Sequence, residues 1–71
     1  MSVSYNGLWK LLIDKKMKKS DLIKRLEISS STIAKMTKDE AVSLRIIEKI
    51  CRELDCDFGD IVHYMKDEEG E

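Results

Sequence analysis

Residues 19–38 read KSDLIKRLEISSSTIAKMTK, and this stretch decides the fold. Its apolar residues recur at helical spacing in two groups, which a short polar turn separates. The first group predicts a short helix that begins near Lys19, and the second predicts another helix after the hydroxyl run 29–32. Ser29 is the predicted N-cap, because its hydroxyl can accept a hydrogen bond from an amide that the helix leaves unpaired. The two helices would pack across the turn through their apolar residues, Leu22, Leu26, Ile28, Ile33 and Met36.

Helical periodicity continues on both sides of this stretch. Residues 5–16 predict a first helix, and a fourth is expected behind a cap at Ser43. Asp57 and Asp60 resemble a capping box that opens a short fifth helix. The apolar stripes consist of Leu8, Trp9, Leu11, Leu12 and Ile13 in the first helix and of Leu44, Ile47, Ile50, Cys51 and Leu54 in the fourth. One residue from each helix is predicted to meet in the core: Trp9, Leu22, Ile33, Ile47 and Phe58.

Length and composition agree with this pattern. The chain has 71 residues, of which 42% are hydrophobic and 38% are charged. This length allows one domain, which buries only about 60% of the surface of its unfolded chain. Proline is absent and glycine occurs three times, so little material exists for β-turns. We therefore predict an all-α fold, a compact five-helix bundle.

The two ends of the chain lie outside the predicted bundle. Val3 and Tyr5 alternate with serines, and residues 61–64 are β-prone, so these segments could pair as a short terminal β-ribbon or serve a dimer contact. The domain is expected to span residues 5–65. Residues 66–71 are charged and include a glycine, which predicts an acidic disordered tail.

Several classes of function are excluded. No apolar run approaches the length of a membrane span, and the N-terminus lacks a signal peptide. His63 is the single histidine, and Cys51 and Cys56 lie further apart than structural zinc ligands usually do, so both cysteines are interpreted as core residues. The glycines are isolated and form no phosphate loop. We predict no enzyme, no metal, no cofactor and no small-molecule ligand, in a cytoplasmic protein.

Charge is divided unevenly along the chain. Residues 10–38 carry nine basic and three acidic side chains, a balance of +6, whereas residues 39–71 carry four basic and eleven acidic ones, a balance of −7. Residues 19–38 have the pattern of a helix-turn-helix, whose second helix enters the major groove of DNA. Small hydroxyls can approach bases closely, and lysines can meet phosphates. The alternative is a bundle whose charged helix faces are simply solvated.

The same residues resemble the Cro/CI-type (Xre-like) helix-turn-helix family of bacterial and phage regulators. The resemblance begins in residues 17–22 and 26–36 and continues in residues 42–51 and 54–62. Residues 5–12 are similar to a subgroup of short, single-domain members. The resemblance covers about residues 5–63 and implies a lambda-repressor-like DNA-binding domain.

The resemblance also implies roles for individual side chains. The family's base-reading positions fall on Ser30, Ser31 and Lys35 of this chain. Its phosphate-binding positions fall on Lys18, Lys19, Thr32 and Lys38.

Three positions depart from the family pattern. Glu27 stands where glycine is usual, so it should adopt a positive φ. Ile23 stands where a small residue is usual, which leaves the crossing angle of the two helices open. Lys18 replaces a capping hydroxyl, although Asp21 still suits the first turn of the helix.

We therefore predict a sequence-specific transcriptional regulator of double-stranded DNA, a repressor or an accessory regulator. It would read the major groove with the third helix and associate with the nucleoid through DNA. A two-fold homodimer on a palindromic site is physically sensible. The alternative is a protein-binding module of the same fold, such as an antitoxin-like or antirepressor subunit.

Overall fold

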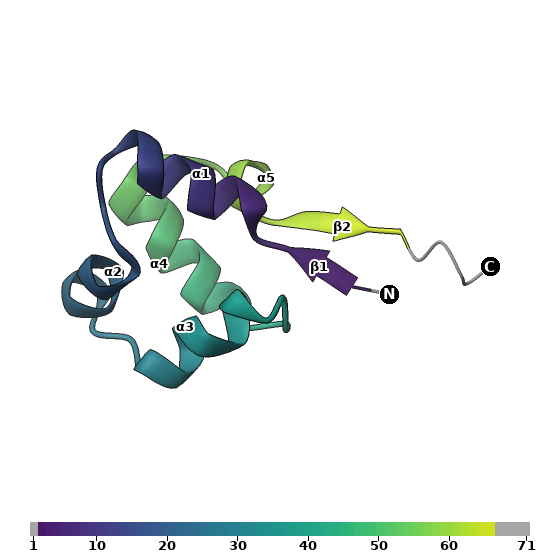
Figure 1. Ribbon diagram of the computed structural model, residues 1–71, viewed down its shortest axis with the longest axis horizontal. Coiled ribbons are helices and arrows are strands. Elements are labelled where there is room, and N and C mark those ends of the chain that lie inside the picture. The colour runs from purple at the N-terminus through teal and green to yellow at the C-terminus, as the bar shows by residue number, and fades with distance from the viewer. Residues whose placement is uncertain (1, 67–71) are drawn as a thin grey trace.

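The computed structural model describes residues 2–66, which form five helices and one short two-stranded ribbon. The five-helix bundle predicted from the sequence is confirmed. Figure 1 shows the other helices arranged around α4, with the ribbon projecting from one end of the helical body. The elements in chain order are β1 (Ser2–Ser4), α1 (Asn6–Asp14), α2 (Lys19–Leu26), α3 (Ser30–Thr37), α4 (Leu44–Leu54), α5 (Phe58–Ile61) and β2 (His63–Met65).

Three helices begin at the capping residues that the sequence predicts. The Ser29 hydroxyl accepts a hydrogen bond from the Thr32 amide at 3.2 Å, and it thereby caps α3. The Ser43 hydroxyl caps α4 in the same way, with the Ile46 amide at 3.3 Å. At the start of α5, the Asp57 amide donates to the Asp60 carboxylate at 2.8 Å, so that the predicted capping box is present.

One hydrophobic core joins all five helices. The predicted core positions Leu22, Ile33 and Ile47 are buried in it, as is Cys51. Ile23 is partly buried against the core, and α2 and α3 are in contact with each other. The buried members are Tyr5, Leu8, Leu12, Leu22, Ile28, Ile33, Met36, Ile47, Ile50, Cys51, Leu54 and Ile61.

Four apolar residues lie further out than the sequence predicts. Phe58 is 39% exposed. It is the first residue of the four-residue helix α5, and the residue of this helix that is buried in the core is Ile61. Trp9 is only partly buried and packs against the outside of the core. Ile13 is 72% exposed, since it lies about 100° round α1 from the buried Leu12. Leu44 is 71% exposed at the first position of α4, beyond the edge of the core.

The terminal ribbon is present, with different bounds from those predicted. β1 and β2 pair antiparallel, with Val3 opposite Tyr64 and Ser4 opposite His63. The prediction was wrong to extend the strands to Tyr5 and residues 61–62. Tyr5 immediately precedes α1, and Ile61 ends α5.

Tyr5 ties the start of α1 to a distant loop. Its buried hydroxyl donates a hydrogen bond of 2.7 Å to the Glu40 carbonyl oxygen, in the connection between α3 and α4. Burial raises the pKa of this hydroxyl, so that the neutral form that donates the bond is retained. The bond fixes where α3 ends relative to α1.

Each of the helices α1 to α4 is followed within two residues by a residue with left-handed backbone. In residues 2–66 every residue with a positive φ is other than glycine, and Glu27 has the predicted conformation, with φ of 56°. The other residues with a positive φ are Lys16, Asp39 and Asp55. Such a conformation strains a residue that has a Cβ, at a cost of about 1 kcal/mol.

The predicted acidic tail lies mostly outside the described part of the chain, because residues 67–71 are not described. Among the helices of residues 2–66, none has both the length and the apolar character needed to span a bilayer.

The strain at Glu27 gives a first testable prediction. Glu27→Gly should stabilise the domain by about 1 kcal/mol, because glycine adopts a positive φ freely. In a domain of this size, that gain raises the melting temperature by about 4–8 °C. Thermal unfolding followed by circular dichroism measures it. The control is Lys24→Gly, in the exposed interior of α2, which should destabilise by about 1 kcal/mol. Destabilisation by both variants would contradict the strain at Glu27.

Candidate nucleic-acid interface

Helix α3 presents a polar side to solvent. Ile33 and Met36 are buried and attach the helix to the core. Ser30, Ser31, Lys35 and Lys38 are all exposed. Ser31 and Lys35 are four residues apart and therefore lie on the same face of the helix. The predicted base-reading residues thus gather on the side that faces away from the core.

A group of three hydroxyls lies at the start of α3. The Ser29 Oγ is 2.9 Å from the Ser31 Oγ and also 2.9 Å from the Thr32 Oγ1. The Ser29 Oγ also receives the Thr32 amide, as described for the cap. Ser30 takes part in none of these three bonds. Ser31 and Thr32 are therefore held toward the cap in the free protein, whereas the Ser30 hydroxyl is held by none of these bonds.

Two lysines lie at the start of α2. Lys18 occupies the N-cap position, and its backbone amide donates to the Asp21 carboxylate at 2.9 Å. A lysine side chain has no acceptor and cannot cap the helix itself. The Lys18 side chain is exposed, and the Asp21 carboxylate supplies a negative charge at the positive end of the helix.

Lys19 differs from Lys18 in having specific side-chain contacts. Its Nζ lies 4.2 Å from the centroid of the Trp9 ring, a cation–π contact. The same Nζ donates a hydrogen bond of 2.9 Å to the Thr37 Oγ1. Because Thr37 immediately precedes Lys38, this bond brings the start of α2 to the end of α3. Two of the predicted phosphate-binding lysines therefore lie at one end of the helix-turn-helix, and Ser30 and Ser31 lie at the other end of α3.

Sequence reasoning missed the parts that Trp9 and Thr37 play at this site. Trp9 had been assigned to the core, and Thr37 had been given no role. Both contact Lys19 across sequence separations that periodicity cannot detect, since the residues belong to three different helices.

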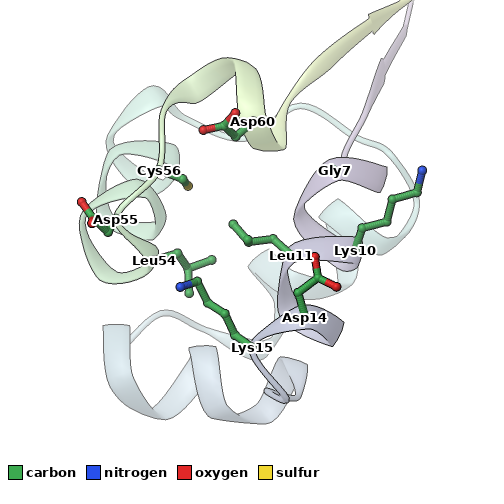
Figure 2. Close-up of a pocket in the computed structure, with 9 residues that line it drawn as sticks. All are labelled: Gly7, Lys10, Leu11, Asp14, Lys15, Leu54, Asp55, Cys56 and Asp60. Atoms are coloured by element: carbon green, nitrogen blue, oxygen red, sulfur yellow. The ribbon is translucent and has the colours of Figure 1, made fainter.

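A hollow lies on another part of the molecule, between α1, the end of α4 and α5 (Figure 2). It has a volume of about 450 Å³, and charged side chains of both signs stand around it. Gly7 lies at its edge, where an added Cβ would overlap the Asp60 carbonyl oxygen and lie 2.7 Å from the His63 Nε2. The lining residues are Gly7, Lys10, Leu11, Asp14, Lys15, Leu54, Asp55, Cys56 and Asp60.

The two thiols at this end of α4 do not form a reactive site. Burial raises the pKa of Cys51 to about 11, with a further contribution from Cys56. Burial also raises the pKa of Cys56. Both thiols are therefore protonated at neutral pH, and the thiolate is the reactive form. Within residues 2–66, no group of three histidine, cysteine or acidic side chains is placed to hold a metal ion.

Comparison with known proteins identifies the family of the chain. The family model for the Cro/C1-type helix-turn-helix DNA-binding domain matches residues 7–67. The chain belongs to this family. Cro/C1-type domains are DNA-binding modules of transcriptional regulators and not enzymes. The family resemblance seen in the sequence and the predicted class of function are therefore confirmed.

Individual relatives of the Cro/C1-type domain are similar over most of the chain. An uncharacterized HTH-type transcriptional regulator of Bacillus subtilis (strain 168), YozG, is 36% identical over 61 residues, which cover 83% of this chain and 73% of YozG. The crystal structure of the transcriptional regulator VanUg superposes with a TM-score of 0.89 and 52% sequence identity, over 93% of this chain and 88% of that one. The similarity in structure and the similarity in sequence therefore both relate the chain to transcriptional regulators.

The Ser29 hydroxyl that caps α3 gives the second prediction. Ser29→Ala should destabilise the domain by about 1 kcal/mol, because the Thr32 amide loses its partner. Ser29→Asp should restore the stability, since a carboxylate also caps a helix. Urea unfolding measures both changes. Ser20→Ala, at an exposed position of α2, is the matched control and should shift stability much less. Equal losses for Ser20→Ala and Ser29→Ala would contradict the capping role.

Proposed function

We propose that the chain binds a specific sequence of double-stranded DNA by inserting α3 into the major groove. The observation that carries this proposal is the exposed side of α3, where Ser30, Ser31 and Lys35 stand free of the core. The major groove admits an α-helix, and each base pair presents a distinct pattern of donors and acceptors there. Membership of the Cro/C1-type family supports the same choice.

Base reading and phosphate binding fall to different side chains. Lys35 can donate to the O6 and N7 atoms of guanine, and both of these atoms are acceptors in the major groove. Ser30 and Ser31 are short and can both donate and accept, so they discriminate less between bases. Lys18, Lys19, Thr32 and Lys38 bind phosphates and fix the register of the helix on the duplex.

The charge of the rest of the chain supports this orientation. The excess of basic residues lies in residues 10–38, which include α2 and α3, and the excess of acidic residues follows them. DNA phosphates attract the basic part of the chain and repel the acidic part, so an approach through residues 10–38, which include α2 and α3, is favoured.

We propose further that the chain binds DNA as a homodimer and acts as a repressor. One α3 contacts few bases, whereas a two-fold dimer reads two half-sites about 34 Å apart. A dimer that occupies its DNA site prevents other proteins from binding there. Such occupancy represses transcription without a contact between the dimer and another protein.

An apolar hollow of about 410 Å³ offers a surface for the second copy. The exposed side chains of Leu44 and Phe58 line it, together with Val3 and Val62 near the ribbon. The ribbon has only two strands, so each strand keeps an unpaired edge. Identical edges and faces pair about a two-fold axis, which is the symmetry of a palindromic site.

The third prediction separates the two kinds of lysine. Lys35→Ala should cost about 1–3 kcal/mol on the preferred duplex and much less on a scrambled one, because only base contacts carry sequence information. Lys38→Ala should weaken binding to both duplexes alike and flatten the plot of log K against log salt by about 1. Fluorescence anisotropy with a duplex selected from random DNA measures these effects at several salt concentrations.

The control is Lys10→Ala, which makes the same change of charge beside the hollow of Figure 2 and should leave both affinities nearly unchanged. Equal losses on the two duplexes for Lys35→Ala would remove it as a base reader. An absence of binding to any duplex at low salt would favour the protein-binding module instead.

The fourth prediction concerns the second copy. Leu44→Glu should shift the chain from dimer to monomer, because it buries a charge in the apolar contact. Sedimentation equilibrium measures the mass. Ile13→Glu is the matched control, since Ile13 is as exposed as Leu44 but lies on α1 away from the hollow. A monomeric wild type at all concentrations would contradict the dimer, and a Leu44→Glu dimer would contradict this surface.

A further inference from the structure

We propose that Trp9 is a positioning residue for DNA binding, which holds the Lys19 ammonium, together with Thr37, in place for one phosphate. This inference rests on the proposed function, because it assigns a partner to one of the proposed phosphate-binding lysines. It adds a residue of α1 to a site that otherwise consists of α2 and α3.

The geometry of the contact is specific. The Lys19 Nζ is 4.2 Å from the Trp9 ring centroid and 2.9 Å from the Thr37 Oγ1. Both distances lie within the ranges of a cation–π contact and a hydrogen bond. Trp9 is partly buried against the core, so its ring has a fixed position. The ammonium therefore rests between a ring of α1 and a hydroxyl of α3.

The hydrogen-bond directions leave the ammonium able to bind a phosphate. The Thr37 hydroxyl donates its single proton to the Ile33 carbonyl oxygen at 3.0 Å. It can therefore only accept from Lys19, and this bond uses one of the three ammonium protons. Lys19 is exposed, so protons remain for a phosphate that approaches from solvent.

The position of Lys19 in α2 supports a binding role. It is the first residue of the helix, where the positive end of the helix dipole disfavours a cation. The ring of Trp9 and the oxygen of Thr37 offset this repulsion. A phosphate that binds beside the ammonium offsets the same repulsion, because its negative charge attracts both the lysine and the positive end of the helix dipole.

Holding the lysine in advance also lowers the entropic cost of binding. A free lysine side chain loses much rotamer freedom when it contacts a phosphate. Lys19 has already lost part of that freedom in the contact with Trp9 and Thr37. Lys18 is its matched neighbour, since it is exposed and takes part in neither contact.

The experiment is a double-mutant cycle on DNA binding. Trp9→Leu keeps an apolar side chain against the core but removes the aromatic face. It should weaken binding to a scrambled duplex about two- to fivefold, the range of an exposed cation–π contact. The salt slope should stay unchanged, because the Lys19 charge still reaches the phosphate. Trp9→Phe should restore part of the affinity, since phenylalanine keeps a weaker aromatic face.

The cycle has two backgrounds. In Lys19→Ala, the Trp9→Leu change should have no further effect on affinity, because no cation is left to hold. In Lys18→Ala, it should weaken binding as much as in the wild type. Thr37→Val is a second variant that leaves Trp9 intact, and its loss of affinity should also vanish in Lys19→Ala. Thermal unfolding of every variant ensures that affinities are compared at temperatures at which each variant is folded.

Each result decides between the alternatives. Equal losses from Trp9→Leu in both backgrounds would show that Trp9 acts only through the fold, and this would overturn the proposal. If Trp9→Leu does not fold, the coupling between Thr37→Val and Lys19→Ala decides in its place. If Lys18→Ala and Lys38→Ala weaken binding but Lys19→Ala does not, the positioning role of Trp9 is wrong while the proposed DNA binding stands. Failure of the wild type to bind any duplex would instead refute the proposed function.

Discussion

The burial of two side chains of α3 determines which side of that helix faces solvent. An eight-residue helix does not persist alone in water, so α3 depends on Ile33 and Met36 in the core and on the cap at Ser29. These three attachments lie on the inner side and at the start of the helix. The exposed side of α3, which includes Ser30 and Lys35, contributes little to this attachment, so its residues can be replaced with little loss of stability. The strained turn at Glu27 and the bond from Tyr5 to Glu40 hold the two ends of α3 in place.

Much of the fold could be predicted from the sequence because its signals are local. Ser29, Ser43 and Asp57 begin helices through bonds to residues at most three positions away. Apart from Glu27, whose position in the family pattern predicted a positive φ, the helix ends gave no such signal, since their left-handed positions carry lysine and aspartate instead of glycine. Periodicity also identified most of the apolar stripes, but it wrongly included Ile13 and could not show where the core stops. Leu44 and Phe58 continue their stripes beyond that limit and are therefore exposed.

The candidate site divides in the same way between local and distant information. The outer face of α3 follows from helical spacing once Ile33 and Met36 are known to be inside. The surroundings of Lys19 do not, because Trp9 and Thr37 come from separate helices and meet only after folding. A sequence can therefore indicate candidate DNA-binding lysines, whereas the structure is needed to show which of them has fixed side-chain contacts. Lys18 and Lys19 are adjacent and identical in type, yet they differ in this respect.

The left-handed residues that end the helices also bear on the lifetime of the protein. Each strained residue with a Cβ lowers the free energy of unfolding by about 1 kcal/mol, and each such decrement raises the unfolded population about fivefold. Cellular proteases degrade unfolded chains, so a small domain with several strained residues is removed faster than a relaxed one. For a transcriptional regulator, rapid removal shortens the time for which an earlier signal persists. Relief of the backbone strain at these helix ends should therefore lengthen the lifetime of the folded domain in the presence of a protease.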